Sequence, residues 1–555
     1  MVRPSFRDIF TPKLVTSLRE GYGLAKFRAD AIAGLTVAIV ALPLSMAIAI
    51  ASGASPDRGL FTAIVGGFLI SALGGSRFQI GGPAGAFIVL VASAVERHGL
   101  DGVMLATMIA GVLLTIAGFL RLGTFIKFIP YPVTVGFTAG IAVIIFASQV
   151  KDLLGLTLGG KEPGPLVEKL NALGQSIDTL NPAALALAVA TIVLIVGIKR
   201  WRPQWPNMLI AVVAASLAGI LLGLPVETIG SRFGGIPSML PAPQLPSFSF
   251  GKLIAVLPDA VAFALLGAIE SLLSAVVADG MTGRRHRSNC ELVAQGIANI
   301  GSALFGGICV TGTIARTATN VRAGANGPVA GMMHSVFLLA FMLLAAPLAS
   351  YIPLAALAGV LAVVAWNMAE KHEFATLVRS SAGDAVVLLA TFLLTIFRDL
   401  TEGIVVGVAL GSILFIYRMV GTTGIAVHAP PASGDRPGSR GAYDPSLAAD
   451  RDVVAYRLSG AFFFGTASLL NAVLDRIGDR SKAFVLDVSA VPFVDSTAAN
   501  TIAAIARKAG RHGVRVFITG ATRDVRQSLL RAGAGRPQVR YRASLDDAVR
   551  EAHTL

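Results

Sequence analysis

Two charged side chains, Glu270 and Arg316, lie within long apolar stretches of the sequence. Glu270 lies in AFALLGAIESLLSAVVA and Arg316 in GGICVTGTIARTATN. A carboxylate among apolar residues is most stable when neutral, so Glu270 could carry a proton. An arginine stays charged and needs an anion, carbonyl groups or water nearby. The alternatives are a neutral Glu270 hydrogen-bonded to a neighbouring helix, and an Arg316 that reaches the membrane surface or only pairs with Glu270.

The segments that must position these side chains are short and interrupted by glycine. QIGGPAGAFIVLV has Pro83 at an early helical position, which proline tolerates because its missing N–H is not needed there. Arg316 lies one turn past the start of a second such segment. Helix starts carry unpaired N–H groups and a positive dipole end, so two facing starts predict an anion site. Further hydroxyl groups could donate to the ligand or bond back to their own helix: Thr311, Thr313, Thr317 and Thr319.

The composition indicates a polytopic membrane protein. Of 555 residues, 54% are hydrophobic and 14% are charged, against about 25% charged in ordinary soluble domains. These values exclude a soluble enzyme, a disordered chain and a fibrous protein. The net charge of +14 indicates orientation in a membrane, and we expect no nucleic-acid partner. The two cysteines form no CxxC pattern, no catalytic motif is present, and we expect neither a metal site, a cofactor nor an enzymatic activity.

Fourteen apolar segments can be distinguished along the chain. With the N-terminus in the cytosol, alternation places the basic connections around 121–127, 199–202, 284–287 and 371–379 inside. We therefore expect a cytosolic N-terminal segment (1–29), a transmembrane domain (30–421), a Pro/Gly-rich linker (422–452) and a cytosolic domain (453–555). The segments are 31–51, 57–75, 84–96, 103–120, 131–149, 182–198, 206–224, 253–277, 291–306, 312–322, 328–347, 351–367, 384–398 and 403–420.

Matching interruptions divide the membrane domain into two halves. Gly82 and Thr311 are about 230 residues apart, and so are Pro43 and Glu270. Seven segments in each half would make the second half inverted relative to the first. Paired short segments in an inverted repeat predict a transport site between them, near the middle of the bilayer. The alternative is that the small residues only allow close helix packing.

The tail alternates predicted strands and helices. VVAYRL, AFVLDVS and VRVFITG are typical of strands, and we expect helices at 466–478, up to about Gly510, and near 523–532. This alternation indicates a small α/β domain. Asp495 and Ser496 come at the predicted start of the second helix, where both residue types serve as caps.

At this point the sequence resembles the SulP (sulfate permease) family of anion transporters. The matching stretches are AGLTVAIVALPLSMAIAIASG (33–53), IGGPAGAF (80–87), IESLLSA (269–275), residues 284–299 and TGTIARTATN (311–320). The resemblance implies an all-α membrane protein of fourteen segments in a seven-plus-seven inverted repeat. In that fold a core domain (segments 1–4 and 8–11) moves past a gate domain (segments 5–7 and 12–14) like an elevator, usually in a homodimer.

The same resemblance implies which residues form the site. By position, the substrate-binding residues are Leu44, Ile48, Ala84, Gly85, Thr313, Ala315 and Arg316. Ala315 replaces the family's usual Ser, while Leu44 and Ile48 replace the Gln and aromatic residue of many eukaryotic relatives. These departures favour binding through backbone amides. Glu270 matches an acidic position associated with proton or sodium coupling, and we expect a proton.

VLDVSAVPFVDSTAANTI (485–502) resembles the core of a STAS domain, a module shared by sulfate transporters and anti-sigma-factor antagonists. Ser496 lies where the antagonists carry a phosphorylatable serine, although helix capping explains the same residues. We expect a regulatory, assembly or trafficking module.

The resulting expectation is a proton-coupled secondary transporter of a small anion such as sulfate, bicarbonate or a dicarboxylate, in the plasma (inner) membrane with the tail in the cytosol. Three alternatives stay open. One is sodium in place of the proton. Another is a nucleobase:cation symporter of the same fold, which we discount because no acid lies between Gly306 and Asn320. The third is an anion-gated sensor or channel-like protein.

Overall fold

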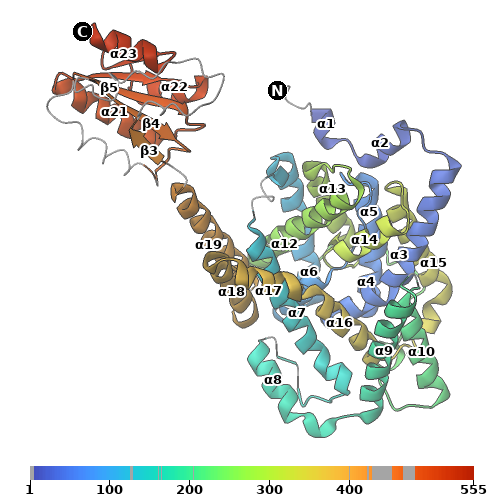
Figure 1. Ribbon diagram of the computed structural model, residues 1–555. Coiled ribbons are helices and arrows are strands. Elements are labelled where there is room, and N and C mark those ends of the chain that lie inside the picture. The colour runs from blue at the N-terminus through green and yellow to red at the C-terminus, as the bar shows by residue number, and fades with distance from the viewer. Residues whose placement is uncertain are drawn as a thin grey trace. The chain divides into compact units, whose positions relative to one another are not determined.

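The computed structural model describes residues 6–124, 129–160, 162–163, 165–203, 205–398, 400–421, 424–427, 453–464, 466 and 482–554. The chain divides into two compact units, Met1–Ala409 and Leu410–Leu555. The described part of the first unit is almost entirely helical, whereas the second contains a five-stranded sheet (Figure 1).

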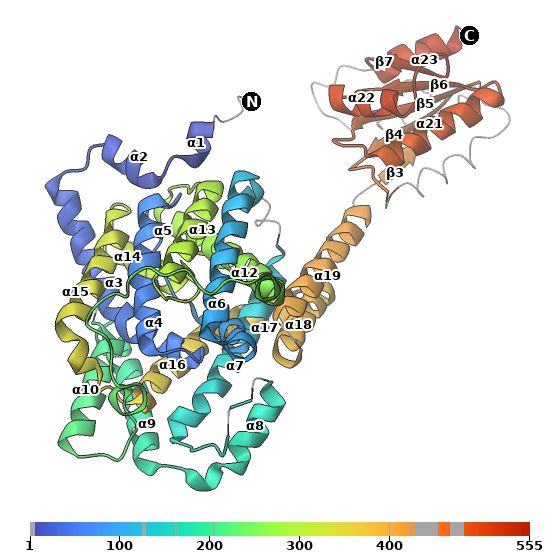
Figure 2. The same ribbon diagram turned by 180° about the vertical axis from the view of Figure 1, so that it is seen from behind.

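One group of helices in the first unit, here called the core set, packs around α6. This helix contacts α12 and α13, while α15 contacts α3 and α5 (Figure 2). The members are α3 (Leu24–Ala51), α4 (Pro56–Phe61), η1 (Thr62–Gly66), α5 (Gly67–Leu73), η2 (Gly85–Phe87), α6 (Ile88–Phe119), α12 (Phe250–Thr282), α13 (Ser288–Leu304), α14 (Ile314–Arg322) and α15 (Val329–Ala349).

A second group, here called the gate set, packs around α7 and α16. Helix α7 contacts α16 and α18, and α9 contacts α10 and α16. The two sets meet where α3 contacts α10 and α16. The members are α7 (Tyr131–Leu154), α9 (Pro182–Trp201), α10 (Asn207–Leu221), α16 (Leu354–Met368), α17 (Lys371–Ser380), α18 (Ala382–Phe397) and the first part of α19 (Leu400–Gly421). This grouping matches the division into core and gate segments that the family resemblance implies.

Short helices occupy the ends and connections of the first unit. They are α1 (Phe6–Phe10), α2 (Lys13–Arg19), η3 (Leu122–Thr124), α8 (Leu166–Gln175), η5 (Ile177–Thr179) and α11 (Ile229–Phe233). Backbone hydrogen bonds fix α2 to the core set: Lys13 N–H donates to Gly74 O at 2.9 Å. The side chain of Arg287 adds a bond from Nη1 to Thr11 O at 2.8 Å. The N-terminal segment therefore packs on the ends of core helices.

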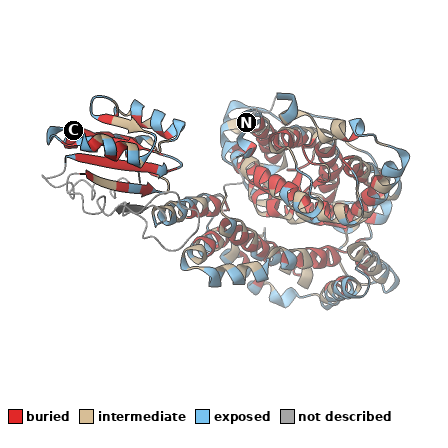
Figure 3. Cartoon of the chain, turned by 45° about the horizontal axis from the view of Figure 1, so that its top comes forward, coloured by how far each residue is buried: buried red, intermediate tan, exposed pale blue. Residues whose placement is uncertain are grey.

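Eight helices of the described residues are long and apolar enough to cross a membrane. They correspond to α3, η2–α6, α7, α9, α12, α15, α16–α17 and α19, and α10 and α18 are shorter apolar helices. Large apolar side chains face outward, among them Leu344 (83% exposed) and Leu221 (80%), and Figure 3 shows such exposed positions beside the buried interior. Apolar side chains on the outside suit a hydrocarbon solvent. The chain is a multi-pass membrane protein.

Each of the fourteen predicted segments contains helical structure, but fourteen separate spans are not confirmed. The predicted segments 84–96 and 103–120 lie in one helical stretch, interrupted only at Gly99, where φ is 69°. The predicted segment 57–75 is covered by α4, η1 and α5, while α13 and α14 have 17 and 9 residues. The predicted segments left 97–102 as a connection, whereas one left-handed glycine is enough to redirect the helix.

Glycine allows the two central core helices to approach closely. A Cβ on Gly111 of α6 would lie 2.6 Å from Gly296 O, and a Cβ on Gly296 of α13 would lie 2.5 Å from Gly111 O. Any side chain at either position would force the helices apart. Small residues at helix contacts are a common means of packing in membranes.

The second unit has strand order β3-β4-β5-β6-β7. Strand β3 pairs antiparallel with β4, and the other pairs are parallel. Helices α21 and α22 share one core with Phe484 and Leu486, whereas α23 shares another with Ala483 and Val485, so helices cover both faces. The elements are β3 (Gly424–Val427), β4 (Val453–Ser459), β5 (Ala483–Ala490), α21 (Ser496–Arg511), β6 (Arg515–Thr519), α22 (Arg523–Arg531), β7 (Val539–Arg542) and α23 (Leu545–His553).

The predicted α/β tail is confirmed, with its three predicted strands as β4, β5 and β6 and two predicted helices as α21 and α22. The predicted helix at 466–478 lies, except for Thr466, outside the described residues. Three elements were not predicted: β3, which lies within the expected linker 422–452, β7 and α23.

Candidate functional site

Two short strands pair with each other within the core set, and a helix start follows each of them. Strand β1 (Gly81–Gly82) pairs antiparallel with β2 (Thr311–Gly312), with Gly82 opposite Thr311. Thr313 N–H donates to Ile80 O at 3.0 Å and extends the pairing. The helical stretch that begins at Gly85 follows β1, and α14 follows β2. Neither start has a side-chain cap, so N–H groups at both starts are available to a ligand.

Arg316 lies between these starts and is 2% exposed. Its Nη2 donates to Ser45 Oγ on α3 at 3.1 Å and to Pro83 O at 3.3 Å. Its Nε and Nη1 are buried and have no hydrogen-bond partner among the described residues. No described carboxylate lies within 4.0 Å of the guanidinium, since the ion pairs of the structure do not include it. Arg316 therefore neither reaches the membrane surface nor pairs with Glu270.

Glu270 lies on α12 and is 8% exposed. Its side chain makes no hydrogen bond or ion pair with a described residue. The helix around it is held against both strands: Gln79 Nε2, before β1, donates to Ser271 Oγ at 2.6 Å, and Thr311 Oγ1 of β2 donates to Gly267 O at 3.2 Å. The carboxylate thus belongs to the same rigid core as the helix starts.

The other predicted binding residues surround the helix starts. Leu44 and Ile48 are buried on α3, on either side of the Ser45 that contacts Arg316. Ala84 is buried and Thr313 is 9% exposed, with its hydroxyl turned to Ile80 O at 3.4 Å. Gly85 is partly exposed and Ala315 is exposed, so both helix starts present an accessible position. The structure brings the predicted residues into one region, and their roles in binding stay predictions.

Three residues near this region were not singled out in the sequence. The hydroxyl of Ser45 accepts a hydrogen bond from Arg316 and donates one to Ala41 O at 2.7 Å. Met368 and Ile145 come from the gate set: a Cβ on Gly85 would lie 3.3 Å from Met368 Sδ and 3.5 Å from Ile145 Cδ1. The gate set therefore covers the first helix start with apolar side chains. Only Ser45, a small polar residue in an apolar stretch two residues after Pro43, offered a signal in the sequence.

Ser496 lies in the second unit and is exposed. The cap of α21 is Asp495, whose Oδ1 accepts from Ala498 N–H at 2.8 Å and whose Oδ2 accepts from Phe464 N–H at 2.9 Å. Asp495 therefore explains the helix start without Ser496. Among the described residues, no three His, Cys, Asp or Glu side chains are grouped so that they could hold a metal ion.

Residues 27–391 match the sequence model of the sulfate permease family. The chain belongs to the sulfate permease family. Residues 444–548 match the STAS domain. The match to the family extends from the start of α3 into α18, and so includes every element of the candidate site. The resemblance inferred from the sequence motifs is confirmed.

Two relatives that are similar in sequence to this sulfate permease chain carry the names of anion transporters. It is 40% identical over 518 residues to "Putative sulfate transporter YvdB" of Bacillus subtilis, covering 93% of this chain and 95% of that one. It is 32% identical over 522 residues to the bicarbonate transporter BicA of a Synechocystis species, covering 90% and 89%.

Two solved structures support the fold. The murine anion transporter Slc26a9 superposes with a TM-score of 0.86 at 19% identity, covering all of this chain and 96% of that one. The transmembrane domain of a cyanobacterial BicA superposes with a TM-score of 0.62 at 32% identity, covering 69% of this chain and 98% of that one.

Proposed function

We propose that this chain is a secondary active transporter of a small anion. The observation that carries the proposal is Arg316: a fully buried cation with two unpartnered donor atoms, at two uncapped helix starts. A buried charge without a partner is costly, and an anion at this place would satisfy the guanidinium and the free N–H groups together. The names of the relatives support sulfate or bicarbonate, and a dicarboxylate is the third candidate.

Glu270 is the proposed coupling residue. It is a nearly buried carboxylate without a cationic partner among the described residues, and a bound proton removes the cost of burying its charge. Sodium is the alternative coupling ion. Proton-driven and sodium-driven uptake distinguish the two ions.

The proposed mechanism is an elevator-like movement of the core set past the gate set. Both helix starts, Arg316 and Glu270 belong to the core set, while Met368 and Ile145 cover Gly85 from the gate set. A rigid movement of the core would carry the whole site away from this cover. The proposed setting is the plasma membrane, as a homodimer, with the basic connections, N-terminus and STAS domain in the cytosol.

Uptake into proteoliposomes tests the proposal. Labelled sulfate, bicarbonate, fumarate and uracil are each offered with a proton gradient, a sodium gradient or neither. Saturable, gradient-driven accumulation of one of the three anions is expected. Uptake that does not saturate would instead favour a channel-like protein, and uptake of uracil in place of anions would favour the nucleobase symporter.

An arginine pair on one helix gives the residue-level test. Arg316→Ala is expected to raise the half-saturation concentration at least tenfold, because it removes the buried cation. Arg322→Ala is the matched control, since Arg322 lies at the exposed end of the same α14 helix. Equal effects of both substitutions would contradict a binding role for Arg316.

A further inference from the structure

One face of α12 is hydrogen-bonded to the elements that form the anion site. Gly267, Ser271 and Ser274 are spaced four and then three residues apart, so they share this face. Glu270 lies three residues after Gly267 and four before Ser274, and so belongs to the same face. The three bonds are Thr311 Oγ1 to Gly267 O at 3.2 Å, Gln79 Nε2 to Ser271 Oγ at 2.6 Å, and Ser274 Oγ to Thr317 Oγ1 at 3.0 Å.

Gln79 makes the bond whose partner lies next to Glu270 in the chain. Both its side chain and Ser271 are buried, and Gln79 comes two residues before β1. The side chain of Gln79 packs against the backbone of Gly312 in β2, where a Cβ would lie 1.8 Å from Gln79 Nε2. A glycine at position 312 therefore leaves the room that the amide needs to reach α12.

Stability alone does not explain an amide at position 79. The Oε1 atom of Gln79 is buried and has no hydrogen-bond partner among the described residues. A buried amide with one unpaired group costs free energy, whereas a methionine of similar length would carry no unpaired polar group. The bond to Ser271 is thus kept at a cost to the fold, which points to a contribution other than stability.

We propose that Gln79 is a positioning residue for coupling. Through Ser271 it joins the segment that leads into the first helix start to the turn of α12 that carries Glu270. A change of charge on Glu270 and the binding of an anion then influence each other through this bond, and such an influence is reciprocal. This inference rests on the proposed transport function and on the proposed coupling role of Glu270.

Glu270 has no charged partner that would carry this role instead. Charged groups on other elements of the structure form no hydrogen bond or ion pair with Glu270 among the described residues. They are Arg97 and His98 of α6, which pair with Asp259, Glu291 of α13, which accepts from Ser76 N–H at 2.9 Å, Arg316 of α14, and Glu370 after α16, whose charge acts on Glu270. Glu270→Gln is the reference that separates the pH dependence due to this carboxylate from that of the other groups.

The test is how the half-saturation concentration of the anion changes with pH in proteoliposomes that contain the full chain, with equal pH on both sides. The probe is whichever of labelled sulfate, bicarbonate and fumarate the chain accumulates. The ratio of the half-saturation concentrations at pH 8 and pH 6 is expected to be about five or larger, because a proton on Glu270 favours anion binding. Gln79→Met should reduce this ratio about threefold, since it removes one hydrogen bond.

A second variant removes the same bond from its other end. Ser271→Ala deletes only the hydroxyl that accepts from Gln79, and should reduce the ratio by the same factor. The double variant should reduce it no further, because both substitutions break one bond. If sodium is the coupling ion, the same ratio is taken between low and high sodium concentrations.

Ser302→Ala is the matched control. Ser302 is a fully buried serine of α13, and its hydroxyl donates to Ile308 O at 2.7 Å without contacting α12. Its loss should lower the thermal stability and leave the ratio unchanged. A purely structural role of Gln79 predicts the same behaviour for Gln79→Met, with half-saturation concentrations raised equally at both pH values.

The outcomes separate this inference from the function on which it rests. An unchanged ratio in Glu270→Gln would overturn the proposed coupling role of Glu270. A ratio that falls in Glu270→Gln but stays at its original value in Gln79→Met and Ser271→Ala would overturn the role of Gln79 alone. An equal reduction of the ratio in Ser302→Ala would assign the effect to general loosening of the core set and would also overturn the inference.

Discussion

Gly82 and Arg316 are in such close contact that no side chain fits between them: a Cβ on Gly82 would lie 1.8 Å from Arg316 Nη1. The two residues come from the paired strand β1 and from helix α14. The conformation of the guanidinium is thus set by the glycine backbone on one side and by Ser45 and Pro83 O on the other. The absence of a side chain at Gly82 is what allows Arg316 to lie at both helix starts.

Gly82→Ala is accordingly predicted to displace the Arg316 side chain and to weaken anion binding. We expect the half-saturation concentration for uptake to rise about tenfold, because about 1.4 kcal/mol of binding free energy corresponds to that factor. Gly280→Ala on α12 is the control, since a Cβ there would meet no atom within 4 Å. An equal effect at Gly280 and at Gly82 would contradict this account.

The hydroxyl of Thr317 is predicted to stabilise the paired strands β1 and β2. It accepts from Ile80 N–H at 3.1 Å and from Ser274 Oγ at 3.0 Å, and the side chain is fully buried. Thr317→Val leaves a buried N–H without an acceptor, which costs about 1–3 kcal/mol. The measurement is the midpoint temperature of thermal inactivation in detergent.

Thr319→Val supplies the comparison for Thr317 on the same helix. Thr319 only bonds back to Ala315 O at 2.8 Å, so its replacement should change the inactivation temperature little. An equal decrease of the inactivation temperature in the two variants would show that the hydroxyl groups along α14 contribute equally, which would contradict this prediction.

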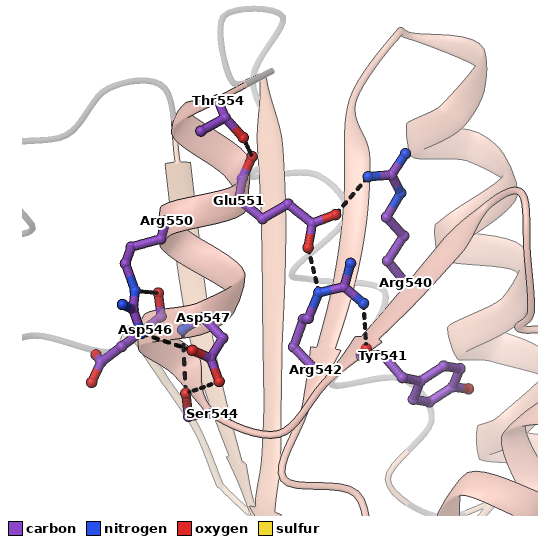
Figure 4. A network of polar contacts seen from close by, with 9 residues as sticks. All are labelled: Arg540, Tyr541, Arg542, Ser544, Asp546, Asp547, Arg550, Glu551 and Thr554. Carbon is purple, nitrogen blue, oxygen red and sulfur yellow. Dashed lines mark hydrogen bonds and ion pairs between the residues drawn. The ribbon is translucent and has the colours of Figure 1, made fainter.

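The STAS unit is predicted to lose stability in acid through Glu551. Arg542 and Arg540 both donate to this carboxylate, Arg540 at 2.6 Å, and tie α23 to β7 (Figure 4). Hydrogen bonds from Arg542 and then Arg540 hold the pKa of Glu551 below its ordinary value of 4.5. A lowered pKa in the folded state stabilises the fold above the ordinary pKa, and this stability is lost as the pH falls below it.

Circular dichroism of residues 422–555 between pH 6 and pH 3 tests the role of Glu551. Glu551→Gln should reduce stability at pH 6 and should flatten the acid dependence below about pH 4.5, because the substituted amide does not titrate. Asp547 also has a lowered pKa, through Ser544 first and Arg550 next, and so part of the acid dependence should persist. An unchanged acid profile in Glu551→Gln would exclude the contact as a source of stability.

Asp495 and Ser496 are predicted to have separable effects. Asp495→Ala removes the cap of α21 and should lower the free energy of unfolding of the STAS unit by about 1 kcal/mol. Ser496→Ala should leave stability within about 0.5 kcal/mol, because the side chain is exposed. Chemical denaturation measures both, and a loss of transport regulation in Ser496→Ala without a loss of stability would support the proposed regulatory role.

The paired helix starts could be predicted from the sequence because their signal is local. Gly81, Gly82 and Pro83 together disfavour a continuous helix, and a charged Arg316 within an apolar stretch is conspicuous. The contacts of Ser45, Ile145 and Met368 depend on which helices pack together, and no local pattern encodes that.

The remaining differences also have physical causes. The polar run around Gly99 has the composition of a loop, but its neighbours satisfy their backbone bonds as helix on both sides of one left-handed residue. Strands β3 and β7 are only four residues long. The sequence of β7, VRYR, does alternate apolar and charged residues, but two periods are too few to identify a strand.

The pairing of Gly82 with Thr311 joins residues about 230 positions apart. Neither half of the polypeptide therefore contains a complete site, and each half alone would leave β1 or β2 with unpaired peptide groups inside hydrocarbon. During synthesis β1 therefore stays unpaired until the second half has been inserted into the bilayer. Two separately encoded fragments, divided in the connection before α12, would accordingly regain uptake only when both are produced in the same cell.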